Sequence, residues 1–239
     1  KNVNIGIENS ENDVILLNSD TIVTKRWLQK LTYCAYSKKN IGTVTPVSNN
    51  AGAFSVPIIG ESNKIPEGLT LNEMANIVEK VSKKVFMEVP TGNGFCMYIK
   101  RDTIDSVGLF DFENFGKGYC EENDFCMRAI NKGWLNVIDD SIYIYHNKGA
   151  SFSEKREKLI KEHRKILDLK HPEYTQAVRD FLASNELKLI HNNLDNYLKE
   201  FVFLDDKYNT FKLNKKRILY VLHSGSGGTP KTNKDLMTQ

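Results

Sequence analysis

The chain has 239 residues, of which 40% are hydrophobic and 26% are charged, and its formal net charge is +3. This balance is typical of a folded globular protein and excludes a disordered or collagen-like chain. A charge so close to neutral also argues against a dedicated nucleic-acid-binding protein, which usually has a strongly basic surface. The apolar runs are far shorter than the roughly 20 residues that span a bilayer, so we expect no membrane-spanning segment.

Four cysteines are spread along the chain without the dense spacing of a disulfide scaffold. We therefore expect reduced thiols and a cytoplasmic protein. A zinc site built from Cys120, Cys126 and a distant histidine is an alternative, but the spacing of the two cysteines is wider than that of usual zinc-ligand pairs.

The first predicted strand lies within residues 13–20, where four aliphatic residues are followed by three polar ones. Such a run predicts a strand that is buried on both faces, as in a parallel α/β sheet. Ligands of open α/β sheets bind beyond the carboxyl ends of the strands, so Asn18, Ser19 and Asp20 are well placed for chemistry. A helix with an apolar stripe is predicted next, over residues 24–37.

The following stretch, up to residue 146, alternates helical periods, short apolar runs and segments rich in glycine and proline. A turn that contains Gly92, Asn93 and Gly94 separates two of the predicted strands. Gly133 stands at a natural end for the helix predicted over residues 121–132. The predicted elements are helices over residues 71–85 and 121–132, and strands over residues 42–46, 86–89, 95–99, 134–138 and 142–146.

The composition of the sequence changes after residue 153, where charged residues dominate and apolar residues recur at helical spacing. We therefore expect a helical extension over residues 153–213. A new apolar run at residues 218–222 and a glycine-rich turn after it predict the opening of a second α/β domain. Pro230 stands where a phosphate-binding loop requires its second glycine, which argues against an NTPase.

Three groups of polar residues lie at predicted strand ends or at a helix start: the Asn18 to Asp20 group, the acidic group that begins with Glu121 and Glu122, and His146. A carboxylate and an imidazole from separate strands can share one divalent cation, and a nearby acidic group can accept a proton. Each group alone has a plain structural explanation, as a turn, a helix-dipole partner or a hydrogen-bonded strand end. Their combination favours a functional site.

Five sequence blocks, in order, resemble glycosyltransferase family 2, which has the GT-A fold. They are DVILLNSDT (13–21), TGNGFCMYIKR (91–101), VGLFDFENF (107–115), GYCEENDFCMRAINKGW (118–134) and YHNKGASF (145–152). Five ordered blocks are far more specific than a single motif. The resemblance implies inverting transfer of a sugar from a nucleotide-sugar donor, usually with Mg²⁺ or Mn²⁺ as the cofactor.

The resemblance also assigns residues to the metal. Asn18, Ser19 and Asp20 match the D-x-D metal motif of the family, with Asn18 in the place of the first aspartate. Asp20 is then the direct metal ligand. His146 matches a histidine that approaches the metal in related enzymes. Asn18 and Ser19 remain candidates for binding the donor.

The acidic group matches the E-D pair of the family, whose second member resembles the catalytic base. That residue is Glu122 here, one methylene longer than the usual aspartate, with Glu121 and Asp124 as further catalytic candidates. Arg128 is a candidate for donor or acceptor binding, although its spacing favours an ion pair with Asp124 on the same helix.

Gly92, Asn93 and Gly94 resemble the loop that lines the donor sugar and the acceptor. Residues 1–152 would then be a partial GT-A domain, an α/β domain with a mixed Rossmann-like sheet that lacks its N-terminal βαβ half. Residues 153–213 would be the helical extension, and residues 214–239 would begin a GT-B-like domain of family 4. We expect these 239 residues alone to bind the donor poorly and to have negligible activity.

The implied function is transfer of a hexosyl or deoxyhexosyl group to a glycan or lipid-linked acceptor in bacterial cell-surface and cell-wall polysaccharide biosynthesis. The implied location is the cytoplasm or the inner face of the membrane, with peripheral membrane association left open and no nucleic-acid partner. Two alternatives stay open. One is a non-catalytic module that binds carbohydrate or nucleotide within a larger transferase, and the other is a sugar nucleotidyltransferase, which would release pyrophosphate.

Overall fold

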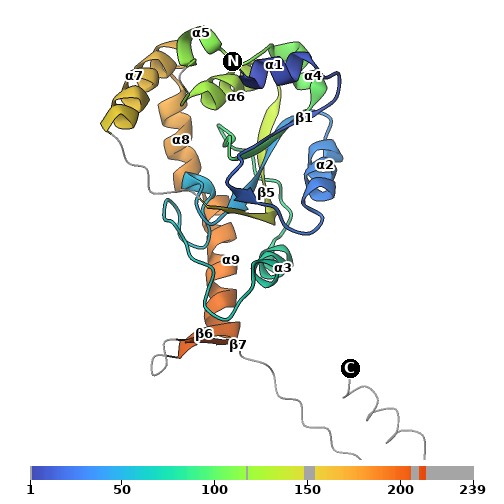
Figure 1. Ribbon diagram of the computed structural model, residues 1–239, viewed down its shortest axis with the longest axis vertical. Coiled ribbons are helices and arrows are strands. Elements are labelled where there is room, and N and C mark those ends of the chain that lie inside the picture. The colour runs from blue at the N-terminus through green and yellow to red at the C-terminus, as the bar shows by residue number, and fades with distance from the viewer. Residues whose placement is uncertain (1, 117, 148–153, 206–209, 214–239) are drawn as a thin grey trace, which may run out of the picture.

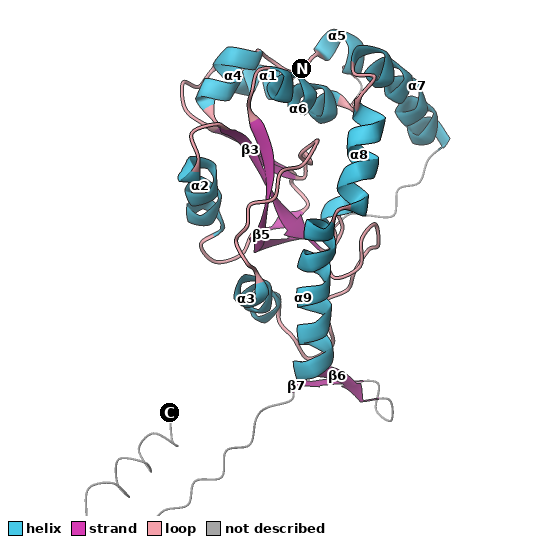
Figure 2. Cartoon of the chain, turned by 180° about the vertical axis from the view of Figure 1, so that it is seen from behind, coloured by secondary structure: helices cyan, strands magenta, loops and turns pink. Residues whose placement is uncertain are grey.

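The computed structural model describes residues 2–116, 118–147, 154–205 and 210–213. Within them, a five-stranded mixed sheet stands between two groups of helices (Figure 1). Figure 2 shows α2 and α3 on one side of the central strands and α8 and α9 on the other. The strand order is β1-β4-β3-β5-β2. The strands are β1 (Val14–Leu17), β2 (Thr21–Ile22), β3 (Ile41–Ser48), β4 (Cys96–Ile99) and β5 (Leu135–His146).

The prediction for the first strand was wrong in two respects. β1 pairs antiparallel with β4, with Leu17 opposite Cys96, and β4 is its one strand neighbour among the described residues. Its residues are not fully buried, and Leu17 is 43% exposed. The physical reason is that β1 is an edge strand in this sheet and that all four of its residues line a cleft. Among the strands of the described residues, β3 and β5 are the one pair that runs parallel.

The two predicted strands at residues 134–138 and 142–146 form one strand, β5. Its register against β3 shifts between them, because Pro46 pairs with Asp139 while Val47 pairs with Tyr143. Asp139 Oδ1 accepts hydrogen bonds from the Ser141 N–H at 2.9 Å and from the Ser141 hydroxyl at 2.6 Å, which supports this bulge. Burial raises the pKa of Asp139 to about 6 despite these bonds. The residues between the two predicted strands, Asp139 to Ser141, therefore form a β-bulge within one strand.

Helix α3 (Leu71–Val81) begins at a capping box, in which Thr70 and Glu73 each bond the backbone N–H of the other. Such caps fix the start of a helix by satisfying its first free N–H groups. The helix was predicted to continue to residue 85 but ends at Val81. Lys84 and Phe86, just beyond it, have positive φ angles that no helix accommodates.

Helices α2 (Trp27–Ser37) and α6 (Glu121–Asn131) confirm the predicted helices to within three residues, and β3 and β4 confirm two predicted strands. The strand predicted at residues 86–89 is reduced to one bridge, between Glu88 and Val137. Four short helices had no counterpart among the predicted elements. They are α1 (Asn2–Glu8), η1 (Gly52–Phe54), α4 (Arg101–Val107) and α5 (Phe112–Phe115).

The described residues of the predicted helical extension form three helices and a two-stranded antiparallel sheet. It packs on the sheet domain, since Phe181, Leu187 and Leu194 are buried in the same core cluster as residues of β3 and β5. Among the described residues, no helix is both long and apolar enough to cross a membrane. The second domain predicted over residues 214–239 lies outside the described residues. The elements of the extension are α7 (Glu154–Lys170), α8 (Tyr174–Ala183), α9 (Asn185–Phe201), β6 (Val202–Asp205) and β7 (Thr210–Leu213).

Candidate functional site

A cleft of about 1070 Å³ opens where β1 and β5 end. Its walls come from chain segments far apart in sequence: the turn after β1, the turn before β4, the start of α6 and the end of β5. The structure therefore brings the three predicted polar groups to one place. The predicted site residues that line the cleft are Asn18, Asp20, Asn93, Gly94, Glu121, Glu122 and His146.

The pairing of β2 with β5 places Asp20 beside His146. Thr21 lies opposite His146 in this pairing, and the Asn147 N–H donates to the Asp20 carbonyl at 2.8 Å. Asp20 Oδ1 lies 3.3 Å from His146 Nε2. The Asp20 side chain is 43% exposed and the His146 side chain 7%, so the histidine forms the floor of this corner and the carboxylate faces the open cleft.

The His146 ring is held in one orientation. Its Nδ1 lies 2.8 Å from the Asn50 carbonyl oxygen and must donate to it, because a carbonyl only accepts. In the neutral ring, Nε2 then directs a lone pair toward Asp20. The ring stacks on Phe95 with centroids 5.5 Å apart. The Asn49 side chain accepts from the His146 N–H at 2.6 Å and donates to the His146 carbonyl at 3.2 Å.

Asp20 and His146 fit a divalent cation. When the imidazole is neutral, Nε2 and Asp20 Oδ1 are two acceptors facing each other, an arrangement that a proton or a cation between them stabilises. Asn18 Nδ2 lies 3.5 Å from the same nitrogen, at the limit of a hydrogen bond. A carbonyl on the far ring nitrogen, as Asn50 supplies, is the usual support of a metal-binding histidine. In the described ranges no group of three or more His, Cys, Asp or Glu side chains is arranged for a metal, so substrate oxygens and water would complete the coordination.

Glu121 and Glu122 open helix α6 and line the cleft. Burial raises the pKa of Glu122 to about 7, and repulsion from Glu121 adds to this, while backbone hydrogen bonds, one of them from Gly94, lower it in part. Burial also raises the pKa of Glu121, whose Oε2 is buried and has no hydrogen-bond partner among the described residues. A carboxyl group poised near pH 7 is suited to act as a general base.

Asp124 and Arg128 were predicted as site residues but do not line the cleft. Asp124 is fully buried, and its carboxylate is bound by Arg128 Nε at 2.8 Å, Lys170 Nζ at 2.9 Å and His171 Nε2 at 3.0 Å. Arg128 also donates to the carbonyl of Val107, the last residue of α4, at 2.8 Å and to that of Leu109, just after the helix, at 2.9 Å. The ion pair that their spacing favoured is confirmed. A catalytic role for Asp124 and a ligand-binding role for Arg128 do not match these positions, because both side chains are engaged within the structure.

Gly92 and Ser19 also lie outside the cleft wall. Gly92 is buried, and a Cβ atom added to it would lie 2.5 Å from Met97 Sδ and 2.8 Å from Thr45 Oγ1. Glycine is required there because β3 and β4 pack closely against the turn. Ser19 is exposed in the turn between β1 and β2.

The sequence did not single out the residues that hold His146, namely Asn49, Asn50 and Phe95. The only local signal is the Asn-Asn pair in a segment rich in glycine and proline, and that pair equally indicates an ordinary turn. In the sequence, Phe95 is one more apolar residue of a predicted strand, and nothing marks it as a partner of His146.

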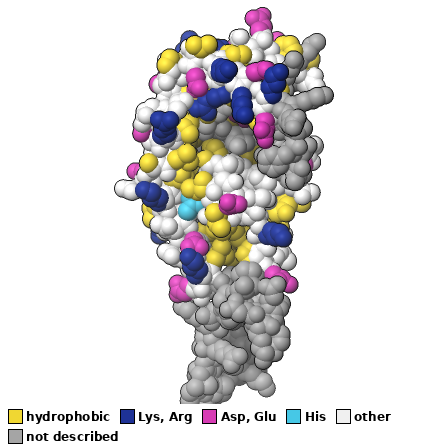
Figure 3. Space-filling model, turned by 90° about the vertical axis from the view of Figure 1, so that its left-hand side faces the viewer, with side chains coloured by type: hydrophobic (Ala, Val, Ile, Leu, Met, Phe, Trp, Pro, Cys, Tyr) yellow, Lys and Arg dark blue, Asp and Glu magenta, His cyan; other side chains and the backbone are white. Residues whose placement is uncertain are grey.

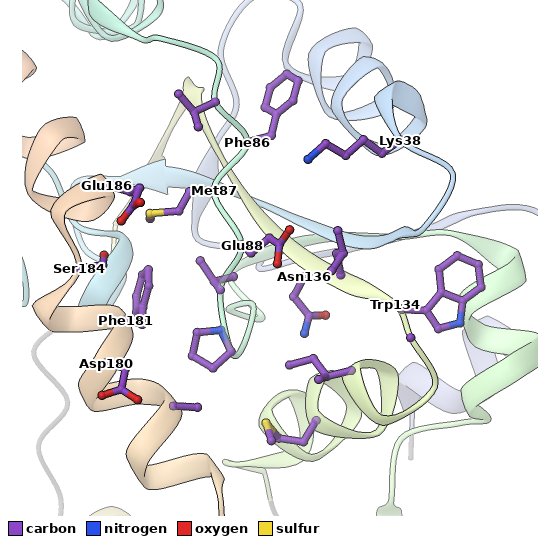
Figure 4. Close-up of a pocket in the computed structure, with 18 of the residues that line it drawn as sticks. Lys38, Phe86, Met87, Glu88, Trp134, Asn136, Asp180, Phe181, Ser184 and Glu186 are labelled. Carbon is purple, nitrogen blue, oxygen red and sulfur yellow. The ribbon is translucent and has the colours of Figure 1, made fainter.

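A second cavity, of about 770 Å³, lies beside α8 (Figure 4). Aromatic side chains from separate elements, Phe86, Trp134 and Phe181, line it together with acidic residues such as Glu88 and Asp180. None of the predicted site residues belongs to its lining. The predicted chemistry therefore belongs to the first cleft.

The surface carries a contrast of charge and hydrophobicity. On the face shown in Figure 3, lysine and arginine side chains gather toward the end of the molecule that holds α4, α5 and α7 in Figure 1. Apolar side chains surround a hollow below them. Positive charge beside a hollow favours anionic ligands.

No protein-family model matches the chain, and a search of curated proteins finds no match either. Among solved structures, the crystal structure of GalNAc-T7 with UDP, GalNAc and Mn²⁺ is similar to this chain with a TM-score of 0.44 and 13% sequence identity. The match covers 85% of this chain and 42% of that chain, so this chain spans less than half its length. A similarity at this level does not by itself define a fold or a function.

The raised pKa of Glu122 predicts a pH-dependent stability. Its folded pKa of about 7 lies above its ordinary value of 4.5, so the folded protein binds more protons between these values and loses stability as the pH rises through them. Glu122→Gln should therefore raise the free energy of unfolding by about 1–3 kcal/mol at pH 8 and change it little at pH 4. Urea unfolding at both pH values measures this.

The control is Glu113→Gln, since Glu113 is exposed on α5. It should change the stability by less than about 0.5 kcal/mol at either pH. If the Glu122→Gln protein is less stable than the wild type at pH 8, the ionised Glu122 side chain does not destabilise the folded protein, and the prediction is wrong.

Proposed function

We propose that this chain belongs to a glycosyltransferase that moves a sugar from a nucleotide-sugar donor to an acceptor hydroxyl. The observation that carries the proposal is the cleft itself, which gathers the Asp20 and His146 pair and a glutamate, Glu122, whose pKa is near 7. The five blocks that resemble glycosyltransferase family 2 supply the reaction that uses such an arrangement.

The leaving group sets the first chemical requirement. When the bond between the sugar and the nucleoside diphosphate breaks, negative charge builds on a phosphate oxygen, and a divalent cation held by Asp20 and His146 would stabilise that charge. The chain positions both residues before substrate arrives. The pairing of β2 with β5 fixes the Asp20 backbone, and the Asn50 carbonyl fixes the His146 ring.

The acceptor sets the second requirement. Its hydroxyl must lose a proton as it attacks the anomeric carbon, and the Glu122 carboxylate would take that proton. Glu121 supports this role, because its negative charge helps to raise the pKa of Glu122 toward the working pH. A single displacement inverts the configuration and needs one carboxylate base, whereas retaining glycosidases need both a nucleophile and an acid.

The finer assignments rest on the sequence resemblance. They are a hexosyl or deoxyhexosyl donor, a glycan or lipid-linked acceptor, Mg²⁺ or Mn²⁺ as the metal, and a place in bacterial cell-surface polysaccharide biosynthesis. Asn93 and Gly94 line the cleft and would contact the donor sugar or the acceptor. A second transferase domain that begins within residues 214–239 is also part of this proposal.

Loss of the base should slow transfer strongly. In the natural polypeptide that carries these residues, Glu122→Gln should lower kcat by about 10²–10⁴-fold while donor binding is kept, because a general base contributes about that factor. The measurement is release of nucleoside diphosphate from a panel of nucleotide sugars. In the wild type, kcat/KM should fall as the pH drops below about 7, as Glu122 becomes protonated.

The same assay separates the alternatives. Glu113→Gln serves as the control and should keep the wild-type rate, since this residue is exposed and lies outside the cleft lining. Release of pyrophosphate would identify a sugar nucleotidyltransferase, and donor binding without any product would identify a non-catalytic module. Wild-type rates in the Glu122→Gln variant would refute the assignment of the base.

Removal of either metal-facing side chain should weaken cation binding. Asp20→Asn and His146→Gln should each raise the Mn²⁺ concentration at half-saturation at least about 10-fold in the presence of a nucleoside diphosphate, because loss of a residue that merely supports a ligand already costs about 10–100-fold. The loss of the free Mn²⁺ signal in electron paramagnetic resonance measures this without turnover. His191→Gln is the control, since His191 bonds the Pro57 carbonyl on another part of the molecule. Equal Mn²⁺ binding in all variants would remove Asp20 and His146 from the metal site.

A further inference from the structure

The turn before α6 is conformationally strained. Three consecutive residues have positive φ angles: Gly118 at 91°, Tyr119 at 71° and Cys120 at 72°. This region of backbone space suits glycine and is unfavourable for tyrosine and cysteine. Such a turn persists only where its surroundings hold it. Cys120 immediately precedes Glu121, so the turn determines where the two glutamates of the cleft begin.

His163 of α7 binds this turn directly. His163 is buried, with 7% of its surface exposed. The Nδ1 atom of its ring lies 2.7 Å from the Gly118 carbonyl oxygen and 3.0 Å from the Tyr119 carbonyl oxygen. Because both carbonyls can only accept, Nδ1 donates its hydrogen to them. The ring also packs edge-on against Phe115, with centroids 5.6 Å apart. One imidazole therefore satisfies two carbonyls of the strained turn.

Asp124 forms a second link between α6 and the extension. Its buried carboxylate is bound by Lys170 at the end of α7 and by His171 just after it, in addition to Arg128. Burial alone would raise the pKa of Asp124, but hydrogen bonds from these three side chains outweigh that effect and lower it. Asp124 therefore stays ionised and ties α6 to the corner between α7 and α8.

Asn123 forms the third link, on the residue next to Glu122. Its Nδ2 donates to the Tyr174 hydroxyl at 2.7 Å and to the Thr91 hydroxyl at 2.9 Å. Tyr174 is buried and begins α8. The amide thus joins α6 both to the extension and to the turn before β4.

We propose that α7 and α8 fix the 118–124 segment in its working position, and that His163 is a positioning residue for Glu122. The inference rests on the proposed role of Glu122 as the base. None of the four linking residues from the extension lines the cleft, so each acts through α6 and not on the substrate. These linking residues are His163, Lys170, His171 and Tyr174.

Hydrogen exchange measured by mass spectrometry on the natural polypeptide tests the positioning. His163→Phe keeps an aromatic ring beside Phe115 but removes the donor, so the amides of residues 118–124 should exchange at least tenfold faster. His163→Asn returns a donor close to the position of Nδ1 and should restore much of the protection. If the asparagine variant exchanges as fast as the phenylalanine variant, the hydrogen bond does not hold the turn and the proposal fails.

A matched control separates positioning from general destabilisation. His191 of α9 is also a buried histidine whose Nδ1 bonds a carbonyl, that of Pro57, at 2.8 Å. His191→Phe should leave exchange in residues 118–124 unchanged, and equal acceleration in both variants would overturn the proposal. If His163→Phe does not fold, Lys170→Ala replaces it, since Lys170 is partly exposed. This variant should also accelerate exchange in the segment, and unchanged exchange would refute the link through Asp124.

Kinetics then test the consequence for Glu122. His163→Phe should lower kcat at least tenfold with little change in the KM for the donor. The acid limb of kcat/KM should move to lower pH, because a displaced Glu122 is better hydrated. The positioning role is refuted if a variant whose residues 118–124 exchange faster keeps the wild-type kcat and the wild-type acid limb of kcat/KM. A wild-type protein without sugar transfer would refute the proposed function, while the exchange result would stand on its own.

Discussion

Strand β5 is the constraint on which the rest of the structure depends. It pairs in parallel with β3, carries β2 on its other edge and packs against α2, α3 and α6. His146 stands at its end, and pairing with β2 brings Asp20 to that histidine. Helix α6 leads into the start of the same strand through Gly133, so the glutamates reach the cleft from the opposite end of one continuous unit. Strand β5 and the helix that leads into it therefore connect the Asp20 and His146 pair with the two glutamates.

The two halves of the cleft differ in how they are held. Asp20 and His146 rely on strand pairing and on the Asn50 carbonyl, which are contacts within the sheet domain. Glu121 and Glu122 instead follow a strained turn whose carbonyls are bound from α7. Burying a carboxyl group so that its pKa approaches 7 costs stability, and such a cost is common where a group is prepared for chemistry.

The sequence predicted some of this arrangement well and missed other parts for physical reasons. The limits of α6 were predictable because Gly133 ends it and two glutamates open it, and the meeting of Asp20 with His146 followed from the polar residues at strand ends. The antiparallel edge position of β1 was not predictable, because an apolar run does not specify its partner. The links from His163 and Lys170 were missed as well, since they are contacts over more than 40 residues and their local sequence is that of any charged helix.

A crystal of the natural polypeptide grown with Mn²⁺ and a nucleoside diphosphate, measured for anomalous scattering, tests the proposed metal site most directly. We expect one strong manganese peak bonded to Asp20 Oδ1 and His146 Nε2, with the diphosphate in the cleft that Glu122 lines. A manganese peak bonded to other side chains, or a diphosphate held in the cavity beside α8, would contradict it.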